Sequence, residues 1–329
     1  MTNATRRRGR AAAASDAPAT GAFRRRGRPD PAARPAGAAP SRRVRPAENA
    51  IAYAFLAAAL VCFAVFSWFP IVRGVLLSFQ RENFVAPPTW VGLDNFQRVI
   101  GDPLFVTAWA NTGYFTILAL IFGFAVPFAV AVLLNEIRHA RGYFRLLVYL
   151  PVMLPPIVTA LLWRWFYDPG PGLFNETLRA LNLPTLEWLN SGDTAMFSLV
   201  LVSTWGNMGT ATLIYLAALQ NIPGELYEAA ELDGAGVWQR IRHVTVPQTR
   251  FVLLALLLLQ IVATMQVFTE PYIMTAGGPE NATVTVLLLL YRYAFVYSDF
   301  GAASALSLML FVALGAFSAL YLRITRSTG

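Results

Sequence analysis

The sequence predicts an all-α membrane protein, a bundle of six transmembrane helices with both termini on the cytoplasmic side. Its 329 residues are 56% hydrophobic and only 13% charged, whereas an average soluble domain is about 25% charged. Six apolar stretches approach the length of about 20 residues that a helix needs to cross a bilayer. The 26 basic residues are all arginine, and their distribution orients the helices.

The six expected spans are separated by short polar or turn-rich segments. Their approximate limits are 50–69, 107–134, 144–166, 195–219, 251–268 and 302–322. The segment 284–297, VTVLLLLYRYAFVY, is also apolar, but it is short and carries Arg292. We expect it to be an interfacial or re-entrant piece on the outer side, with a seventh span as the alternative.

The third span contains three prolines, Pro151, Pro155 and Pro156. Because proline has no backbone N–H, it interrupts the hydrogen-bond ladder of a helix. The prolines therefore predict a kink, or a break in the inner half of the span. The aromatic residues at 163–167 mark its outer, interfacial end.

Arginine is concentrated in the segments that lie inside when the N-terminus is cytoplasmic. In that orientation the inner segments hold twenty arginines and the outer segments and helix ends hold six. Without the N-terminal tail the division is eight to six in the same direction. Since cytoplasmic loops carry the excess of arginine, both termini and the loop at 220–250 are predicted to be cytoplasmic.

Residues 1–48 form a tail rich in alanine, proline, glycine and arginine, ahead of a transmembrane domain at 49–325. The tail holds twelve arginines and three acids, a net charge of +9, and the remainder has a net charge of −1. This composition predicts disorder and attraction to anionic membrane lipid. Nucleic-acid binding is not expected, because Phe23 is the tail's sole aromatic residue.

Several residue types that catalysis needs are missing or isolated. There is no lysine for a P-loop or a Schiff base, and the two histidines, His139 and His243, are far apart. The single cysteine, Cys62, excludes a disulfide framework and a cysteine metal site. We therefore expect no catalytic residue, no metal and no cofactor; the chain is not an enzyme, and any ATP is bound by a partner.

The longest polar interlude between spans is ELYEAAELDGAGVWQRIRHVTVPQTR, at 225–250. Pro223 suits the first residue of a helix, and Glu225 follows in its first turn, where the helix dipole favours acids. Asp233-Gly234 should end this helix, because glycine accepts the left-handed conformation of a C-cap. A second helix is expected at about 236–244, closed by Pro247 before the fifth span.

A helix–turn–helix here has two readings on its residues alone. Small side chains at 229, 230 and 234–236 allow another protein to approach the backbone closely. An amphipathic pair resting on the lipid surface is the alternative. The residue types leave both open.

The spacing of the loop residues resembles the cytoplasmic loop of permease subunits of bacterial ABC importers. The pattern consists of Glu228-Ala229-Ala230, Gly234, Val244, Val246 and Pro247, and Asp233 and Ala235 extend it to the form of the carbohydrate branch, the maltose and glycerol-3-phosphate type. Further matching pieces lie at 90–100, 111–112, 141–175, 203–235 and 277–285, so that the resemblance covers about 50–325. The valines at 244 and 246 and Ile241 depart mildly from the family's usual residues.

The resemblance implies a pore-forming subunit of an ATP-driven importer for a sugar or polyol-type solute in the bacterial cytoplasmic membrane. Its implied partners are two copies of an ATP-binding subunit, a second homologous permease in a heterodimer, and an extracytoplasmic solute-binding protein. The loop would be the coupling helix seated in the ATPase. The residues implied in that contact are Glu228, Ala229, Ala230, Asp233, Gly234, Ala235 and Pro247.

Polar residues recur on one face of two spans. Ser203, Asn207 and Thr210 share a helical face in the fourth span, and Gln260 and Thr264 share one in the fifth. They are candidates for a solute pathway, because polar groups inside a membrane face a cavity or the bundle interior. Hydrogen bonding between helices is the alternative. Gln266 falls on a different face from Gln260, so no continuous stripe is predicted.

A self-contained secondary transporter or channel is the alternative function. Such a protein needs titratable or ion-coordinating groups near the middle of the membrane. The expected spans contain essentially no central acid or histidine. The sequence therefore favours the importer subunit.

Overall fold

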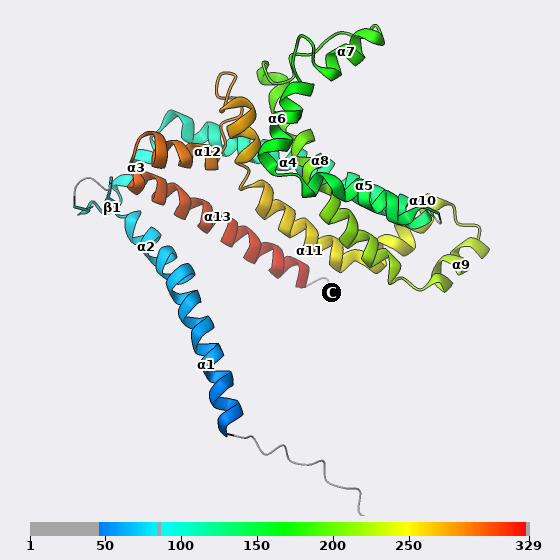
Figure 1. Cartoon of the computed structure of the whole chain (residues 1–329), viewed down its shortest axis with the longest axis horizontal. Helices are drawn as coiled ribbons and strands as arrows, with labels where there is room; N and C mark the ends of the chain where they lie inside the picture. Colours follow the sequence, from blue (N-terminus) through cyan, green and yellow to red (C-terminus); the bar gives the residue numbers. More distant parts are fainter. Residues whose placement is uncertain (1–45, 84–86, 138, 327–329) are drawn as a thin grey trace, which may run out of the picture. The chain divides into compact units, whose positions relative to one another are not determined.

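A computed structural model describes residues 46–83, 87–137 and 139–326 (Figure 1). The chain divides into two compact units, 1–60 and 61–329. In the first unit the described residues belong to an apolar helix, and 1–45 of the predicted tail lie outside the described residues. Apart from most of α1 and the start of the first apolar stretch, the features below lie in the second unit.

The described residues are mostly helical, and π-helical turns (η) interrupt or extend several helices. The elements in chain order are α1 (Pro46–Phe63), η1 (Ala64–Trp68), α2 (Phe69–Leu77), β1 (Gln80–Arg81), β2 (Thr89–Trp90), α3 (Asp94–Ile100), α4 (Pro103–Glu136), α5 (Arg141–Met153), α6 (Pro156–Phe166), α7 (Leu173–Ala180), α8 (Gly192–Gln220), α9 (Gly224–Leu232), α10 (Val237–Arg240), η2 (Ile241–Thr245), α11 (Val246–Thr264), η3 (Pro271–Thr275), α12 (Val286–Tyr291), η4 (Arg292–Val296) and α13 (Phe300–Arg326).

Five helical stretches in the described part of the chain are long and apolar enough to cross a membrane, and a sixth arises if α5 and α6 form one bent span. This agrees with the predicted bundle of apolar helices. The five stretches are Tyr53–Leu77, Pro103–Glu136, Gly192–Gln220, Val237–Thr264 and Phe300–Thr325.

The third predicted span is broken where its prolines lie. α5 and α6 are bent by 97° at the break between Met153 and Pro156. Leu154 donates its N–H to the carbonyl of Pro151, which closes a tight turn. Pro155 and Pro156 have no N–H to continue the helical ladder, so the chain begins a new helix in another direction.

The segment predicted to be interfacial or re-entrant forms the short apolar helix Val286–Val296. It is shorter than the roughly 20 residues that a span needs, which argues against a seventh span. Val286 and Leu289 are buried where α12 packs against α4 and α13. Its first turn is held by Thr112 of α4, whose Oγ1 accepts from the Val286 N–H at 3.0 Å.

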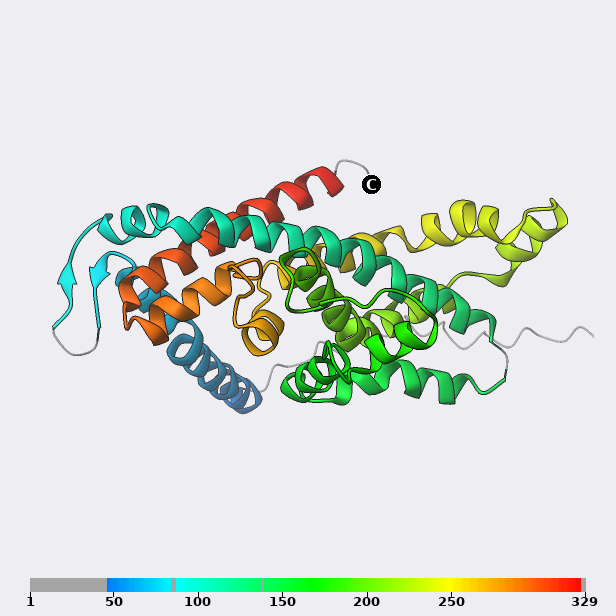
Figure 2. The same ribbon diagram turned by 90° about the horizontal axis from the view of Figure 1, so that it is seen from above.

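α4 and α8 form the central helix pair of the second unit, and α4 is the long teal helix in Figure 2. Tyr215 of α8 is buried and meets the rings of Phe124 and Phe128 edge-on, at centroid distances of 5.9 and 5.6 Å. Such contacts hold membrane helices together, because lipid tails supply no hydrophobic drive between helices.

α5 packs on α8 through Gly209. A Cβ at this position would lie 2.7 Å from the carbonyl oxygen of Val148 and 2.8 Å from Cγ2 of Val152. Both distances are shorter than a van der Waals contact. The absence of a side chain therefore sets how closely the two helices approach.

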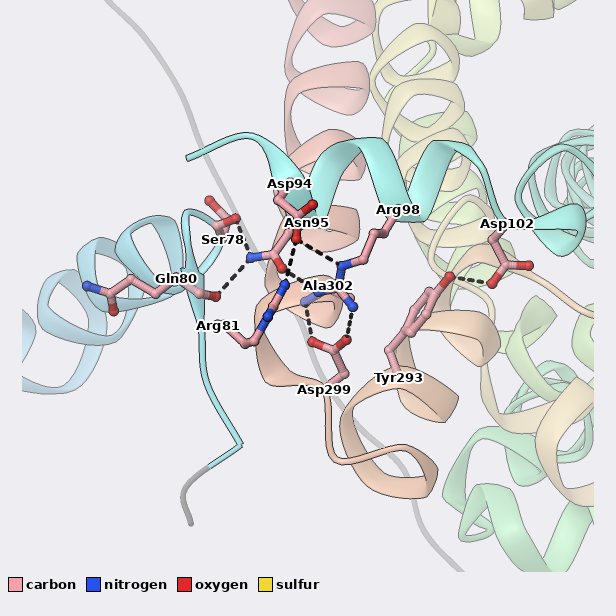
Figure 3. A network of polar contacts seen from close by, with 10 residues as sticks. All are labelled: Ser78, Gln80, Arg81, Asp94, Asn95, Arg98, Asp102, Tyr293, Asp299 and Ala302. Carbon is pink, nitrogen blue, oxygen red and sulfur yellow. Dashed lines mark hydrogen bonds and ion pairs between the residues drawn. The ribbon is translucent and has the colours of Figure 1, made fainter. Parts of the chain in front are cut away.

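A polar network joins the region after α2 to α3, η4 and α13 (Figure 3). Asn95 of α3 is fully buried, and its Nδ2 donates to the carbonyl oxygens of Ser78 and Gln80, at 2.9 and 2.8 Å. Its Oδ1 accepts from Nη2 of Arg98 at 2.6 Å. One amide therefore satisfies two backbone carbonyls and orients an arginine.

Arg98 extends this network to the start of α13. Its Nη1 lies 2.6 Å from Oδ2 of Asp299, and this hydrogen bond raises the pKa of the Arg98 guanidinium. Oδ1 of Asp299 accepts from the Ala302 N–H in the first turn of α13 at 3.0 Å. Nearby, the hydroxyl of Tyr293 donates to Asp102, which caps α4 (Figure 3).

Gly209→Ala should lower the stability of the protein by about 1–3 kcal/mol, because the added methyl forces α5 away from α8. Gly113→Ala is the matched control, since a Cβ at that α4 glycine meets no atom within 4 Å. Thermal unfolding in detergent measures both. Equal melting temperatures for the two variants would contradict the packing assigned to Gly209.

Asn95→Ala should cost about 1–3 kcal/mol by leaving buried carbonyl oxygens without donors. Hydrogen exchange should become faster at the backbone amides of 78–81, next to the carbonyls that lose their partner. Gln97→Ala, on the exposed side of the same helix, is the control. Unchanged exchange in Asn95→Ala would show that the network does not hold this segment.

Candidate functional site

The loop between α8 and α11 folds as a helix–turn–helix, as its residues predict. Pro223 precedes the first residue of α9 instead of starting the helix, and Asp233 is its C-cap. Gly234 has a φ of +77°, its N–H bonds the Glu231 carbonyl, and the Ala235 N–H bonds the Ala230 carbonyl at 2.9 Å. This pair of bonds is the Schellman arrangement that ends a helix at a left-handed residue.

The second half of the loop differs from the prediction. α10 begins at Val237, but the helix continues through η2 into α11, so Val237–Thr264 is one stretch of 28 residues. Pro247 lies in the first turn of α11 and does not close a helix. The π-turn is the reason: Val246 donates to Ile241, and the wider turn accommodates the missing N–H of the proline.

Side-chain contacts make α9 and α10 one unit, which we call the knuckle (residues 224–245; Figure 1). Arg240 forms an ion pair with Glu231 across the turn. The Tyr227 hydroxyl lies 3.0 Å from Oγ1 of Thr245, and Oε1 of Gln239 accepts from the Gly236 N–H at 2.8 Å. The turn between the helices is therefore held at three places besides its own backbone.

Most of the residues that the sequence singles out are exposed, and all of them lie in the knuckle except Pro247, which follows it. Glu228, Ala229, Asp233, Gly234 and Pro247 are exposed. Ala230 and Ala235 are partly buried.

Three large apolar side chains flank the same turn and were not predicted. Leu232 is 90% exposed, Val237 63% and Trp238 74%. The signal was present in the sequence, as apolar residues on either side of Asp233-Gly234. An apolar patch at the tip of a polar loop is typical of a protein-docking surface.

The five predicted pathway residues meet in one cavity of about 480 Å³. It lies between α4, α8 and α11 and the segment that follows α11. The predicted residues that line it are Ser203, Asn207, Thr210, Gln260 and Thr264. Four polar side chains that were not predicted also line it: Thr204, Gln266, Thr269 and Glu270.

Some of these groups also hold the helices together. Nε2 of Gln260 donates to the Ala119 carbonyl of α4 at 2.6 Å, and this contact occupies the space where a Cβ on Gly123 would lie. Oγ1 of Thr264 and Nδ2 of Asn207 bond carbonyls of their own helices. Gln260 therefore serves the interhelical role as well as facing the cavity.

The sequence places Gln266 on a different helical face from Gln260, and both nevertheless line the cavity. α11 ends at Thr264, so helical periodicity no longer sets the direction of later side chains. The chain turns there, and both glutamines line the cavity.

Glu270 lies beyond the predicted fifth span and precedes Pro271, the first residue of η3. Burial raises the pKa of its carboxyl group, against a smaller opposite effect of the Ser203 side chain of α8. The predicted fifth span ends at residue 268, so its helical periodicity does not predict the direction of the Glu270 side chain. The lining of the cavity therefore includes an acidic residue that the sequence did not predict.

The fold is that of a membrane transport component, and residues 123–328 match the family described as binding-protein-dependent transport system inner membrane component. The chain belongs to this family. It is a multi-pass protein of the cytoplasmic membrane and the permease subunit of an ABC importer, a class in which a separate subunit hydrolyses ATP. The predicted resemblance is confirmed.

Named relatives span most of the chain. A probable ABC transporter permease protein of Bacillus subtilis, YurN, is 37% identical over 80% of this chain and 91% of its own. The trehalose/maltose permease protein MalF of Thermococcus litoralis is 32% identical over 85% and 95%. The diacetylchitobiose uptake permease protein NgcF of Streptomyces coelicolor is 31% identical over 92% and 89%.

The fold is also similar to that of a solved structure. A crystallised bacterial ABC transporter that imports the acidic polysaccharide alginate contains a chain that superposes with a TM-score of 0.76, at 24% identity. The match covers 85% of this chain and 96% of that one. The likeness supports the permease fold.

Proposed function

We propose that this permease carries a sugar or related polyol-type solute through the cavity and is driven by ATP-binding subunits that dock on the knuckle. The observation that carries the proposal is the knuckle itself, a rigid helix–turn–helix with small and apolar side chains exposed at its turn. The trehalose/maltose and diacetylchitobiose relatives support a saccharide.

The docking contact combines close approach with apolar burial. Ala229, Ala230, Gly234 and Ala235 let a partner's surface approach the backbone of the turn. Leu232, Val237 and Trp238 supply the apolar area, and exposed Glu228 supplies polar contacts at the rim. Aromatic and apolar anchors at the centre of a small patch carry most of the energy in many protein interfaces.

The continuous helix from Val237 to Thr264 would link this contact to the solute. With a rise of about 1.5 Å per residue, 28 residues extend about 40 Å. Val237 is at the knuckle, whereas Gln260 and Thr264 line the cavity near the other end. A displacement of the knuckle by closing ATPases would therefore move the wall of the cavity that α11 forms.

The importer would contain two ATP-binding subunits, a second homologous permease and an extracytoplasmic solute-binding protein. Family membership supports dependence on a binding protein. The arginine distribution supports cytoplasmic termini and a cytoplasmic knuckle. The tail at 1–48 would add attraction to anionic lipid.

Gly234→Val should leave the protein in the membrane but reduce solute-stimulated ATP hydrolysis and uptake by roughly tenfold or more. No atom lies within 4 Å of a Cβ at Gly234, so the valine would not clash with a neighbour. The loss of coupling would come from the φ of +77°. This conformation costs an L-residue about 1–2 kcal/mol or more. Gly234→Asn should retain more activity, because asparagine tolerates this conformation. Gly224→Val is the matched control, at a glycine with similar open space and no positive φ. Normal coupling in Gly234→Val would refute the role of the turn.

Purification of the tagged protein from its native membranes in mild detergent, with mass spectrometry of what remains bound, tests the assembly. We expect a P-loop ATPase and a second six-span permease. Trp238→Ala should reduce recovery of the ATPase without reducing recovery of the permease. Recovery of this chain alone, even after cross-linking through Gly234→Cys, would favour a self-contained transporter instead.

A further inference from the structure

Glu270 is the sole charged side chain among the described residues that line the cavity. The other polar walls are neutral amides and hydroxyls, including Ser203, Gln260 and Thr264. The described lining residues include no arginine or histidine that could neutralise the acid. The cavity is therefore either neutral or negative, according to the protonation of one carboxyl group.

The charged groups on the surrounding elements lie outside the described lining of the cavity. η3, which follows Glu270, packs against α6 and α8. Arg164 on α6, Asp193 on α8, Arg250 on α11 and Glu136 on α4 are absent from the lining. The phenol of Tyr215 is the other titratable group in the wall.

We propose that Glu270 is a specificity-determining residue that accepts hydrogen bonds from a neutral or amino saccharide and rejects saccharides bearing a carboxylate, sulfonate or phosphate. This rests on the proposed function, because it takes the cavity to be the solute pathway. An ionised carboxylate accepts hydrogen bonds from hydroxyl and ammonium groups but donates none. An anionic solute would meet repulsion with no cation to offset it.

Burial raises the pKa of this carboxyl group. Solute binding and pH therefore both shift the protonation equilibrium of Glu270. Hydroxyl or ammonium donors stabilise the ionised form. Protonation at low pH removes the negative charge. Selection against anions should therefore be strongest at high pH and weaken as the pH falls through the raised pKa.

Charged thiol reagents can test this selection without knowledge of the natural solute. The single native cysteine, Cys62, is exposed and is removed as Cys62→Ala. Thr264→Cys then places a thiol in the cavity wall. The probes are a cationic and an anionic methanethiosulfonate of similar size, applied to the complete importer in proteoliposomes, with each rate divided by that for a thiol in solution.

The parent protein, with Cys62→Ala and Thr264→Cys, should react faster with the cationic reagent. Adding Glu270→Gln should lower the ratio of the cationic to the anionic rate by roughly tenfold, as expected for loss of a nearby unit charge. Glu187→Gln, at an exposed glutamate outside the cavity, is the matched control and should leave the ratio unchanged. The ratio should rise with pH in the parent and remain flat in Glu270→Gln, because thiol ionisation cancels between the two reagents.

The outcomes separate this inference from the proposed pathway. If both reagents react and Glu270→Gln leaves the ratio unchanged, the specificity role of Glu270 is overturned while the cavity remains an accessible pathway. If neither reagent reaches the introduced thiol in any nucleotide state, the pathway is overturned and the inference with it. A pH-dependent ratio that Glu270→Gln abolishes supports both.

Discussion

Inside lipid, every backbone N–H and C=O needs a hydrogen-bond partner within the protein. The rest of this structure depends on that constraint. It makes the membrane part of the chain helical, and it allows irregular backbone only where protein or a cavity covers it. The interruptions therefore mark the places where the protein does something other than cross the bilayer. The break at Met153–Pro156 and the end of α11 at Thr264 are of this kind.

The end of α11 shows how such an interruption supplies a site. A helix that continued past Thr264 would carry Gln266 away from Gln260. Because the helix stops, Gln266 and Glu270 join the walls already formed by Ser203 and Gln260. The cavity receives side chains from a span and from the segment after it, which no single helical face provides.

In the helix that contains the second half of the knuckle, an irregular turn keeps the helix continuous instead of ending it. Pro247 would normally divide it, yet the π-turn at Ile241–Thr245 keeps α10 and α11 continuous. A rigid connection is useful if the two ends have different partners. In the proposed importer one end contacts an ATPase and the other contacts solute, so the wide turn preserves the mechanical link between them.

The sequence by itself determined the class of fold, the helix–turn–helix and the five predicted polar residues that line the cavity. Each of these follows from short-range chemistry: apolar length, the left-handed preference of Gly234, and the return of a helical face after three or four residues. The tertiary structure alone decided the continuity of the helix across Pro247, the size of the bend that the prolines predict after Met153, which is 97°, and the entry of Gln266 and Glu270 into the cavity. Those features depend on hydrogen bonds to backbone groups and on side-chain packing between segments that are distant in the sequence. Local sequence patterns do not specify these contacts.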